Sequence, residues 1–281
     1  MVKPGILVIG HGSREAHWAA SVEEAVGAVR EALRPVPVEA AYLELVEGRL
    51  IQDGIDRLEA AGVTDILAIP LFVSAGSTHV DEIGWALGAY EEPRRETDLE
   101  RIRVRARLTY GRPIADDSEI ADVLLDRVAE ASGLEGREAA EIALLLVGHG
   151  SEEPWFYEEW HRGLDGLAAL MKERGGYADA GVATLRPDEV AAAVRSLKER
   201  APGLVVAAVP VMISEGYFTS SVIPRRLDGL GCVYAESSLL PHPKLQEWIR
   251  RQASLWLREQ EISSRDKEGE HIGENQSEAD L

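Results

Sequence analysis

Three side chains in the first third of the chain are of the types that bind transition-metal ions and accept protons: His11, Glu44 and His79. Each lies beyond a short apolar run with the length of a buried β-strand. If these strands lie parallel in one sheet, the loops that follow them share its carboxyl edge, where α/β folds place their chemistry. Two imidazoles and one carboxylate suit a divalent ion of the zinc, cobalt, nickel or iron(II) kind, with coordination positions left open for a substrate.

Each of these residues also has an ordinary structural explanation when it is taken alone. His11 could hydrogen-bond the backbone of a tight turn, Glu44 could be a solvated or helix-capping carboxylate, and His79 could be a first-turn helix residue. The placement of all three on loops of one sheet edge favours a functional site. His17 and His161 fall within helical patterns, where surface exposure or packing explains them.

The tetrapeptide Gly-His-Gly-Ser occurs twice, as Gly10–Ser13 and as Gly148–Ser151, each time after an apolar run and before a helical pattern. Further along, Ile69–Leu71 is similar to Val209–Val211. Matches at several loops in the same order predict an internal duplication, with a cleft between two related domains.

The second copy does not repeat the whole candidate site. It keeps His149, but the positions that correspond to Glu44 and His79 are expected near Thr184 and Thr219. We therefore expect one metal site, in the N-terminal half, with the C-terminal half closing over it. His149 is then either structural or faces the cleft from the opposite wall.

Strands that alternate with helices predict βαβ units around parallel sheets. The expected strands are Ile6–Ile9, Val38–Leu43, Asp65–Pro70 and Ile102–Leu108 in the first half, and Ile142–Val147, Ala180–Ala183, Leu204–Pro210 and Cys232–Ala235 in the second. The expected helices are Ala16–Leu33, Leu50–Ala61, Val80–Leu87, Ser118–Ala131, Trp155–Arg174, Asp188–Glu199, Ser221–Leu227 and Leu245–Arg258. The predicted fold class is α/β, with two tandem doubly wound four-stranded parallel-sheet domains related by internal duplication.

We expect the first domain over residues 1–131 and its degenerate copy over residues 140–260, joined by a Gly-containing linker around residues 132–136. Residues 261–281 hold seven acidic side chains against two basic ones and few apolar residues. This composition predicts a disordered acidic tail.

Composition excludes several classes of protein. The net charge of −19 argues against general nucleic-acid binding, which needs a basic face. No apolar run is long enough to predict a membrane span, and the N-terminus lacks a signal-peptide pattern. The single cysteine, Cys232, rules out an intramolecular disulfide and suits a reducing cytoplasm. Gly10 and Gly12 lack the third glycine of a dinucleotide fingerprint, and no phosphate-binding loop is present, so we expect no nucleotide cofactor.

The segment from Leu7 to His79 resembles the sirohydrochlorin chelatases, which are class II, ATP-independent enzymes. The resemblance rests on Gly10–Ser13, on Tyr42–Leu45 and on Pro70–Phe72 leading to His79. Because long members carry two tandem copies, it extends over nearly the whole folded chain. It implies a metal chelatase, a lyase of the cobaltochelatase or ferrochelatase type. Such an enzyme inserts Co²⁺, Fe²⁺ or Ni²⁺, taken up as a substrate, into sirohydrochlorin or a related tetrapyrrole in siroheme or cobalamin biosynthesis.

The resemblance also implies roles for the three candidate residues. His11, Glu44 and His79 would be the metal ligands and the proton acceptors. Two pyrrole N–H protons must leave as the metal enters, and an imidazole can take a proton near neutral pH while a carboxylate balances the charge of the ion. We expect a cytoplasmic monomer with a pseudo-two-fold domain pair, whose partner is the tetrapyrrole and neither nucleic acid nor a membrane.

The substrate of that family is a polycarboxylate, so an acidic chain needs local positive groups to hold it. The predicted substrate contacts are Arg14, Ser13, Arg186 and Tyr217, with Arg49 and Arg225–Arg226 as further arginines that could instead be ordinary surface residues. Arg14 would lie at a helix N-terminus, a favourable place for an anion. The aromatic residues of Pro154–Tyr157 and of Tyr217–Phe218 would either stack on a flat macrocycle or pack at the domain interface.

Two other functions compete with a chelatase. A non-catalytic metal or tetrapyrrole carrier would explain a degenerate second half. A histidine phosphatase-like hydrolase also places a histidine after its first strand, but Gly10 stands where that family has an arginine.

Overall fold

The computed structural model describes residues 2–277 and contains two four-stranded parallel sheets. The strands are β1 (Pro4–Gly10), β2 (Val38–Tyr42), β3 (Asp65–Pro70), β4 (Arg107–Tyr110), β5 (Ile142–Gly150), β6 (Asp179–Arg186), β7 (Val205–Pro210) and β8 (Cys232–Tyr234). Their orders are β2-β1-β3-β4 and β6-β5-β7-β8. The matching orders confirm the predicted fold class of two duplicated doubly wound domains.

Helices connect the strands in both halves. They are α1 (Ala16–Ala32), α2 (Ile51–Ala60), α3 (Thr78–Ala86), α4 (Ser118–Ala129), α5 (Pro154–Gly175), α6 (Val190–Arg200), α7 (Ile223–Leu227) and α8 (Pro243–Ser277), with a 3-10 turn at Ala139–Glu141 and a π-helical turn at Phe218–Val222. The central strands are buried on both faces, which explains their unbroken apolar runs.

The fourth strand of the first sheet begins later than expected. We predicted Ile102–Leu108, but β4 starts at Arg107. The backbone N–H of Arg103 donates to Gln52 of α2, and that of Arg105 donates to Glu59. Side chains of α2 therefore take the hydrogen bonds that a neighbouring strand would have used.

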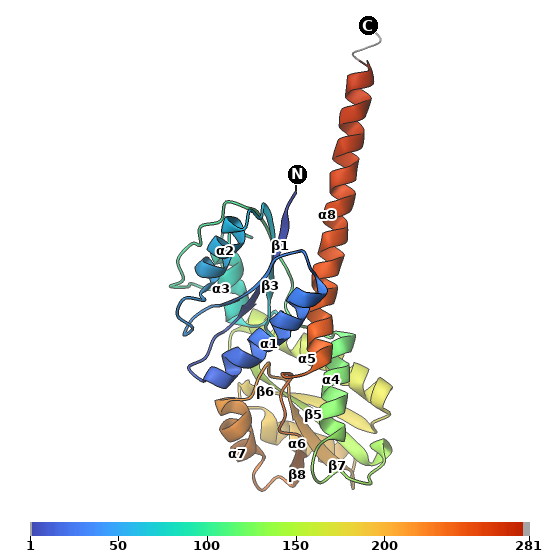
Figure 1. Ribbon diagram of the computed structural model, residues 1–281. Coiled ribbons are helices and arrows are strands. Elements are labelled where there is room, and N and C mark those ends of the chain that lie inside the picture. Colours follow the sequence, from blue (N-terminus) through green and yellow to red (C-terminus); the bar gives the residue numbers. More distant parts are fainter. Residues whose placement is uncertain (1, 278–281) are drawn as a thin grey trace.

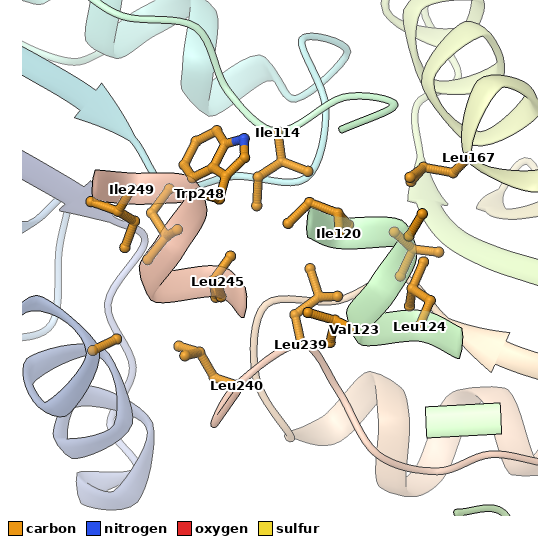
Figure 2. Packing of buried hydrophobic residues seen from close by; sticks show 14 of the residues in the cluster. Ile114, Ile120, Val123, Leu124, Leu167, Leu239, Leu240, Leu245, Trp248 and Ile249 are labelled. Atoms are coloured by element: carbon orange, nitrogen blue, oxygen red, sulfur yellow. The ribbon is translucent and has the colours of Figure 1, made fainter. Parts of the chain in front are cut away.

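The two halves exchange their last helices. Helix α4 ends the first half but packs against α5 and β7, whereas α8 ends the second half but packs against α1 and β3 (Figure 1). Figure 2 shows Leu245, Trp248 and Ile249 of α8 facing a core that continues to Ile120 and Leu124 of α4. This shared core joins the inner faces of both sheets, while α2 with α3 and α6 with α7 cover two separate outer cores. The packing units therefore differ from the sequence halves.

Ion pairs fasten the exchanged helices to each other. Arg251 of α8 binds Asp117 at 2.8 Å and Glu119 at 2.5 Å at the start of α4. Arg127 of α4 donates to the carbonyl oxygens of Ser238 and Pro241, in the segment that leads to α8. These contacts fix the position of one half on the other.

Residues 261–277 differ from the expectation of a disordered tail, because α8 continues without a break to Ser277. Once a helix is nucleated and packed, each added residue costs little, and this stretch has no proline to stop it. Residues 278–281 of the expected tail lie outside the described part of the chain. None of the helices within residues 2–277 combines the length and the apolar content needed to traverse a bilayer.

Candidate functional site

The turn after β1 brings His11 and Glu44 together. Beyond β1 and β2 the parallel pairing continues, since the N–H of Glu44 donates to the carbonyl oxygen of His11 at 3.1 Å. Gly12 has a φ of +99°, and a Cβ at this position would lie 1.9 Å from the carbonyl oxygen of Glu44. Only glycine allows this approach, which explains the Gly-His-Gly sequence.

The ring of His11 is oriented by its own turn. Its Nδ1 lies 3.0 Å from the carbonyl oxygen of Gly12. A carbonyl can only accept, so Nδ1 carries the proton and the lone pair of a neutral ring is on Nε2. That nitrogen lies 3.8 Å from Oε1 of Glu44, and both side chains are partly exposed, at 36% and 53%. The pair can therefore reach an ion arriving from solvent.

His79 lies at the N-terminus of α3 and is oriented by a carboxylate that sequence reasoning missed. Its Nδ1 is 2.5 Å from Oε1 of Glu82, one helical turn further along, and Oε2 of Glu82 accepts a 2.8 Å hydrogen bond from the hydroxyl of Thr97. Burial acts to raise the pKa of Glu82, but the bonds from His79 and Thr97 outweigh it and lower that pKa. Glu82 is therefore an ionised acceptor, which places the His79 proton on Nδ1 and leaves Nε2 free to bind a metal.

The two histidines meet ring to ring, with centroids 4.6 Å apart and planes at 79°. His11 is the shared member, since it contacts His79 on one side and Glu44 on the other. Within residues 2–277, no group of three or more His, Cys, Asp or Glu side chains is already gathered as a metal site. The arrangement is thus an open pair of imidazoles with an exposed carboxylate beside it, which suits transient rather than permanent coordination.

His11 and His79 line a cleft of about 630 Å³ between the two halves of the chain. Apolar side chains such as Phe72 and Met212 form much of its wall. His149 of the second half lines the same cleft, so of the two alternatives the structure supports the one in which it faces the cleft. Burial lowers the pKa of His149, and the positive charge of Arg186 lowers it further.

The register of the sheets corrects one predicted correspondence. Gly10 pairs with Tyr42 in the first sheet and Gly148 pairs with Thr184 in the second, so Thr184 matches Tyr42 and not Glu44. Two residues further along, Arg186 takes the place of Glu44. A Cβ on Gly150 would lie 2.2 Å from the carbonyl oxygen of Arg186, which repeats the approach of Gly12 to Glu44. The sequence comparison missed this correspondence because it aligned β6 with β2 two residues away from the register that the sheets show.

The predicted substrate contacts have different surroundings. Ser13, Arg186 and Tyr217 line the cleft, but Arg14 is not among its lining residues. Arg49 is bound to Glu23 at 2.6 Å, so its charge is already compensated.

The two aromatic stretches also differ in their surroundings. Tyr217 and Phe218 line the cleft, as a stacking role requires. Phe156 is instead buried, and its carbonyl oxygen closely approaches the backbone of Gly76 in the first half. The first stretch therefore packs at the domain interface.

One cationic residue of the cleft was not anticipated from the sequence. Arg95 belongs to the long connection between α3 and β4, and its Nε lies 2.9 Å from Glu153 at the start of α5. The pair bridges the two halves across the cleft. Only the number of arginines in that connection, five between residues 94 and 105, hinted at such a contact.

Comparisons with known proteins agree with this architecture. The family model described as CbiX matches residues 5–131 and matches again at residues 143–255. A sirohydrochlorin cobaltochelatase from Methanopyrus kandleri is 28% identical over 141 residues, covering 46% of this chain and 98% of that protein. A sirohydrochlorin ferrochelatase from Priestia megaterium is 27% identical over 197 residues, covering 69% of this chain and 65% of that protein.

Among solved structures, SirB from Bacillus subtilis with Fe³⁺ superposes with a TM-score of 0.69 over 90% of this chain and 95% of that chain. The sequence identity is 22%, so this likeness concerns the fold. The two family matches within one chain confirm the internal duplication.

Proposed function

Because the chain belongs to the CbiX family, we propose that it is a metal chelatase that inserts a divalent ion, Co²⁺, Fe²⁺ or Ni²⁺, into sirohydrochlorin or a related tetrapyrrole. The observation that carries the proposal is the pair of imidazoles, His11 and His79, that meet at 4.6 Å in the cleft between the halves. Relatives named as cobaltochelatase and as ferrochelatase support the reaction and leave the choice of metal open. The pathway, siroheme or cobalamin synthesis, follows from that choice.

In this proposal, His11, Glu44 and His79 bind the incoming ion and take up the protons that it displaces. The free Nε2 atoms of the two histidines supply neutral nitrogen donors, and Glu44 supplies a negative charge that offsets the charge of the ion as it sheds water. As the ion leaves them for the ring, the same Nε2 atoms are free to accept the two pyrrole protons that it displaces. No nucleotide is needed, because the stability of the metal–tetrapyrrole product drives the exchange.

The macrocycle would lie in the cleft between the histidines of the two halves. Apolar and aromatic residues of its wall, among them Phe72, Met212 and Phe218, suit the flat face of a tetrapyrrole. His149 faces the cleft with a lowered pKa, so at neutral pH it adds no charge that would repel the cation.

The test is to incubate the purified protein with sirohydrochlorin and each of the three metal ions and to follow the visible spectrum of the tetrapyrrole. We expect insertion faster than the uncatalysed rate with at least one ion, and the preferred ion identifies the type of chelatase. The same rates for the protein and for buffer alone, with all three ions, would reject the proposal.

A non-catalytic carrier is separated by the stoichiometry of the same reaction. A carrier converts at most one equivalent of tetrapyrrole, whereas an enzyme continues through many equivalents. The double variant His11→Ala/His79→Ala is the control, because it removes both nitrogen donors. The family match gives no support to a phosphatase-like hydrolase.

A further inference from the structure

A second cavity, of about 390 Å³, opens beside the cleft in the C-terminal half. Arg186, Arg225 and Arg226 line it together with Tyr217 and Phe218, and we call it the arginine pocket. Arg186, Tyr217 and Phe218 also line the cleft, so the two cavities adjoin at these residues. A ligand that fills the cleft can therefore extend into the arginine pocket.

The arginine pocket carries a surplus of positive charge in a chain whose net charge is −19. Among the described residues, one of its three arginines has an acidic partner: Arg226 binds Asp188 at 3.2 Å. Arg226 also donates to the carbonyl oxygen of Leu185 at 2.8 Å, so its guanidinium is fixed in place.

In the part of the chain that the structure describes, the other two arginines of the pocket have no carboxylate partner. Arg225 donates to the hydroxyl of Tyr217 at 3.1 Å and to the carbonyl oxygen of Ser221 at 3.0 Å. The backbone of Arg186 pairs with β5, but within residues 2–277 its side chain makes neither a hydrogen bond nor an ion pair. Two guanidinium groups are thus available to an anion, and their planar forks match a carboxylate.

The position of Arg186 follows from the duplication. It occupies the place in the second sheet that Glu44 occupies in the first, and the same glycine approach fixes the backbone at both. One copy therefore presents an anion beside its histidine, and the other copy presents a cation. A carboxylate suits a metal ion, and a guanidinium suits the acid groups of the molecule that receives the metal.

We propose that the arginine pocket binds peripheral carboxylates of the tetrapyrrole, with Arg186 and Arg225 as their direct partners and Arg226 as a fixed neighbouring charge. This inference rests on the proposed function, because the substrate class comes from it. The arginine pocket belongs to the second half, which has Arg186 in place of Glu44. This half would hold the edge of the macrocycle, and the centre of the macrocycle would face His11 and His79. Metal and tetrapyrrole are thus bound by opposite halves of the duplicated fold.

The experiment measures the dissociation constant for metal-free sirohydrochlorin by fluorescence titration, for wild type and for Arg186→Gln, Arg225→Gln and the double variant. We expect each single variant to weaken binding about tenfold, as loss of a charge-assisted hydrogen bond does. Arg225→Lys, which keeps the charge but not the fork, should recover part of the affinity. The matched control is Arg195→Gln on α6, an exposed arginine of the same half that lines neither cavity.

In the insertion reaction the same variants should raise KM for the tetrapyrrole and leave kcat near wild type, because the contacts are equal in ground state and transition state. Binding of Co²⁺ alone should not change. Arg225 is exposed and bonds only to Ser221 and Tyr217, so its loss leaves the fold intact, which the melting temperature verifies.

If Arg186→Gln and Arg225→Gln bind sirohydrochlorin no more weakly than Arg195→Gln, the arginine pocket is not a carboxylate site. That failure leaves the proposed function standing as long as wild type still inserts metal. Conversely, arginine-dependent binding without any insertion would reject the chelatase and keep the pocket.

Discussion

Replacing Glu82 with glutamine tests whether the orientation of His79 matters for the chemistry. Glu82 does not line the cleft itself. Its Oε1 atom lies 2.5 Å from Nδ1 of His79 and accepts the proton of that nitrogen, which leaves Nε2 free to face an ion. Glutamine keeps an oxygen that can accept the same hydrogen bond and removes the negative charge. The substitution therefore isolates the charge from the geometry.

The size of the expected loss of activity depends on how well the hydrogen bond between His79 and Glu82 is protected from solvent. Loss of the carboxylate behind a metal-binding histidine lowers metal affinity or activity by about 10–100-fold, or about 1.4–2.7 kcal/mol. The side chain of Glu82 is 23% exposed and Thr97 holds its second oxygen, so little solvent screens it. We expect kcat/KM to fall about tenfold in Glu82→Gln, which keeps a neutral acceptor, and about 100-fold in Glu82→Ala, which keeps none.

The assay is the initial rate of metal insertion, compared with the affinity of the metal-free protein for Co²⁺. The control is Glu92→Gln, an exposed glutamate of the connection that follows α3. Because the pKa of Glu82 is lowered from its ordinary value, the carboxylate is ionised at neutral pH, so Glu82→Gln removes a charge that wild type carries under the assay conditions.

A double-mutant cycle decides whether Glu82 acts through His79. In a His79→Ala background, Glu82→Gln should cost almost nothing further, since no ring remains to be oriented. A full additional tenfold loss in that background would refute the reasoning, because it would mean that Glu82 contributes by another route.

Three further substitutions test the site and the fold. Glu44→Gln should lower kcat/KM about 100-fold, because it removes the proposed carboxylate ligand. The melting temperature should not change, because the side chain is half exposed, and the same substitution at exposed Glu47 should leave the rate of insertion unchanged. Gly12→Ala should lower the free energy of unfolding, measured with urea, by about 3 kcal/mol, because Gly12 has a positive φ and the added Cβ would clash with a carbonyl oxygen. The control Gly48→Ala also has a positive φ, but its Cβ would meet no atom within 4 Å, so it should lose only about 1 kcal/mol; equal losses would contradict the clash. Arg251→Met should lower the free energy of unfolding by about 1–2 kcal/mol at pH 7. Folding lowers the pKa of Asp117 from 3.8 and that of Glu119 from 4.5, so the difference from wild type should begin to shrink as the pH falls below 4.5 and should vanish only below the lowered pKa values, where both carboxylates are protonated in the fold.

Much of the fold could be predicted from the sequence, because apolar runs and helical periodicity are local signals. The strands β1, β3 and β7 match their predicted ranges to within about two residues, and the order of elements is as expected. The exchange of α4 and α8 could not be predicted, since an apolar helix face does not reveal which sheet it covers. The late start of β4 was missed for a similar reason, because it depends on side chains of α2 far away in sequence.

The part of the candidate site that follows the ends of parallel strands could be predicted, because those ends lie at one edge of the sheet. His11, Glu44 and His79 lie in contact through His11, although their roles as ligands stay a prediction. Glu82 was missed because a glutamate three residues after a histidine on a helix is common, and only the short contact distinguishes it. The correspondence of Arg186 to Glu44 needed the sheet register, because a shift of two residues leaves an apolar pattern unchanged.

The shared core limits how the cleft can open. Inner faces of both sheets, together with α1, α4, α5 and α8, form one continuous apolar cluster, and a hinge between the halves would have to expose it. At about 25 cal/mol per Å² of apolar surface, even a few hundred Å² would cost several kcal/mol. Other parts of the cleft wall, such as residues 214–216 on one side and residues 76–77 on the other, are loops that take no part in this cluster. We therefore expect entry into the cleft to depend on such loops and not on a hinge between the halves. In the proposed reaction, the fixed sheets would keep His11 and His149 on opposite walls of the cleft, a preorganisation that suits the insertion of an ion into a macrocycle.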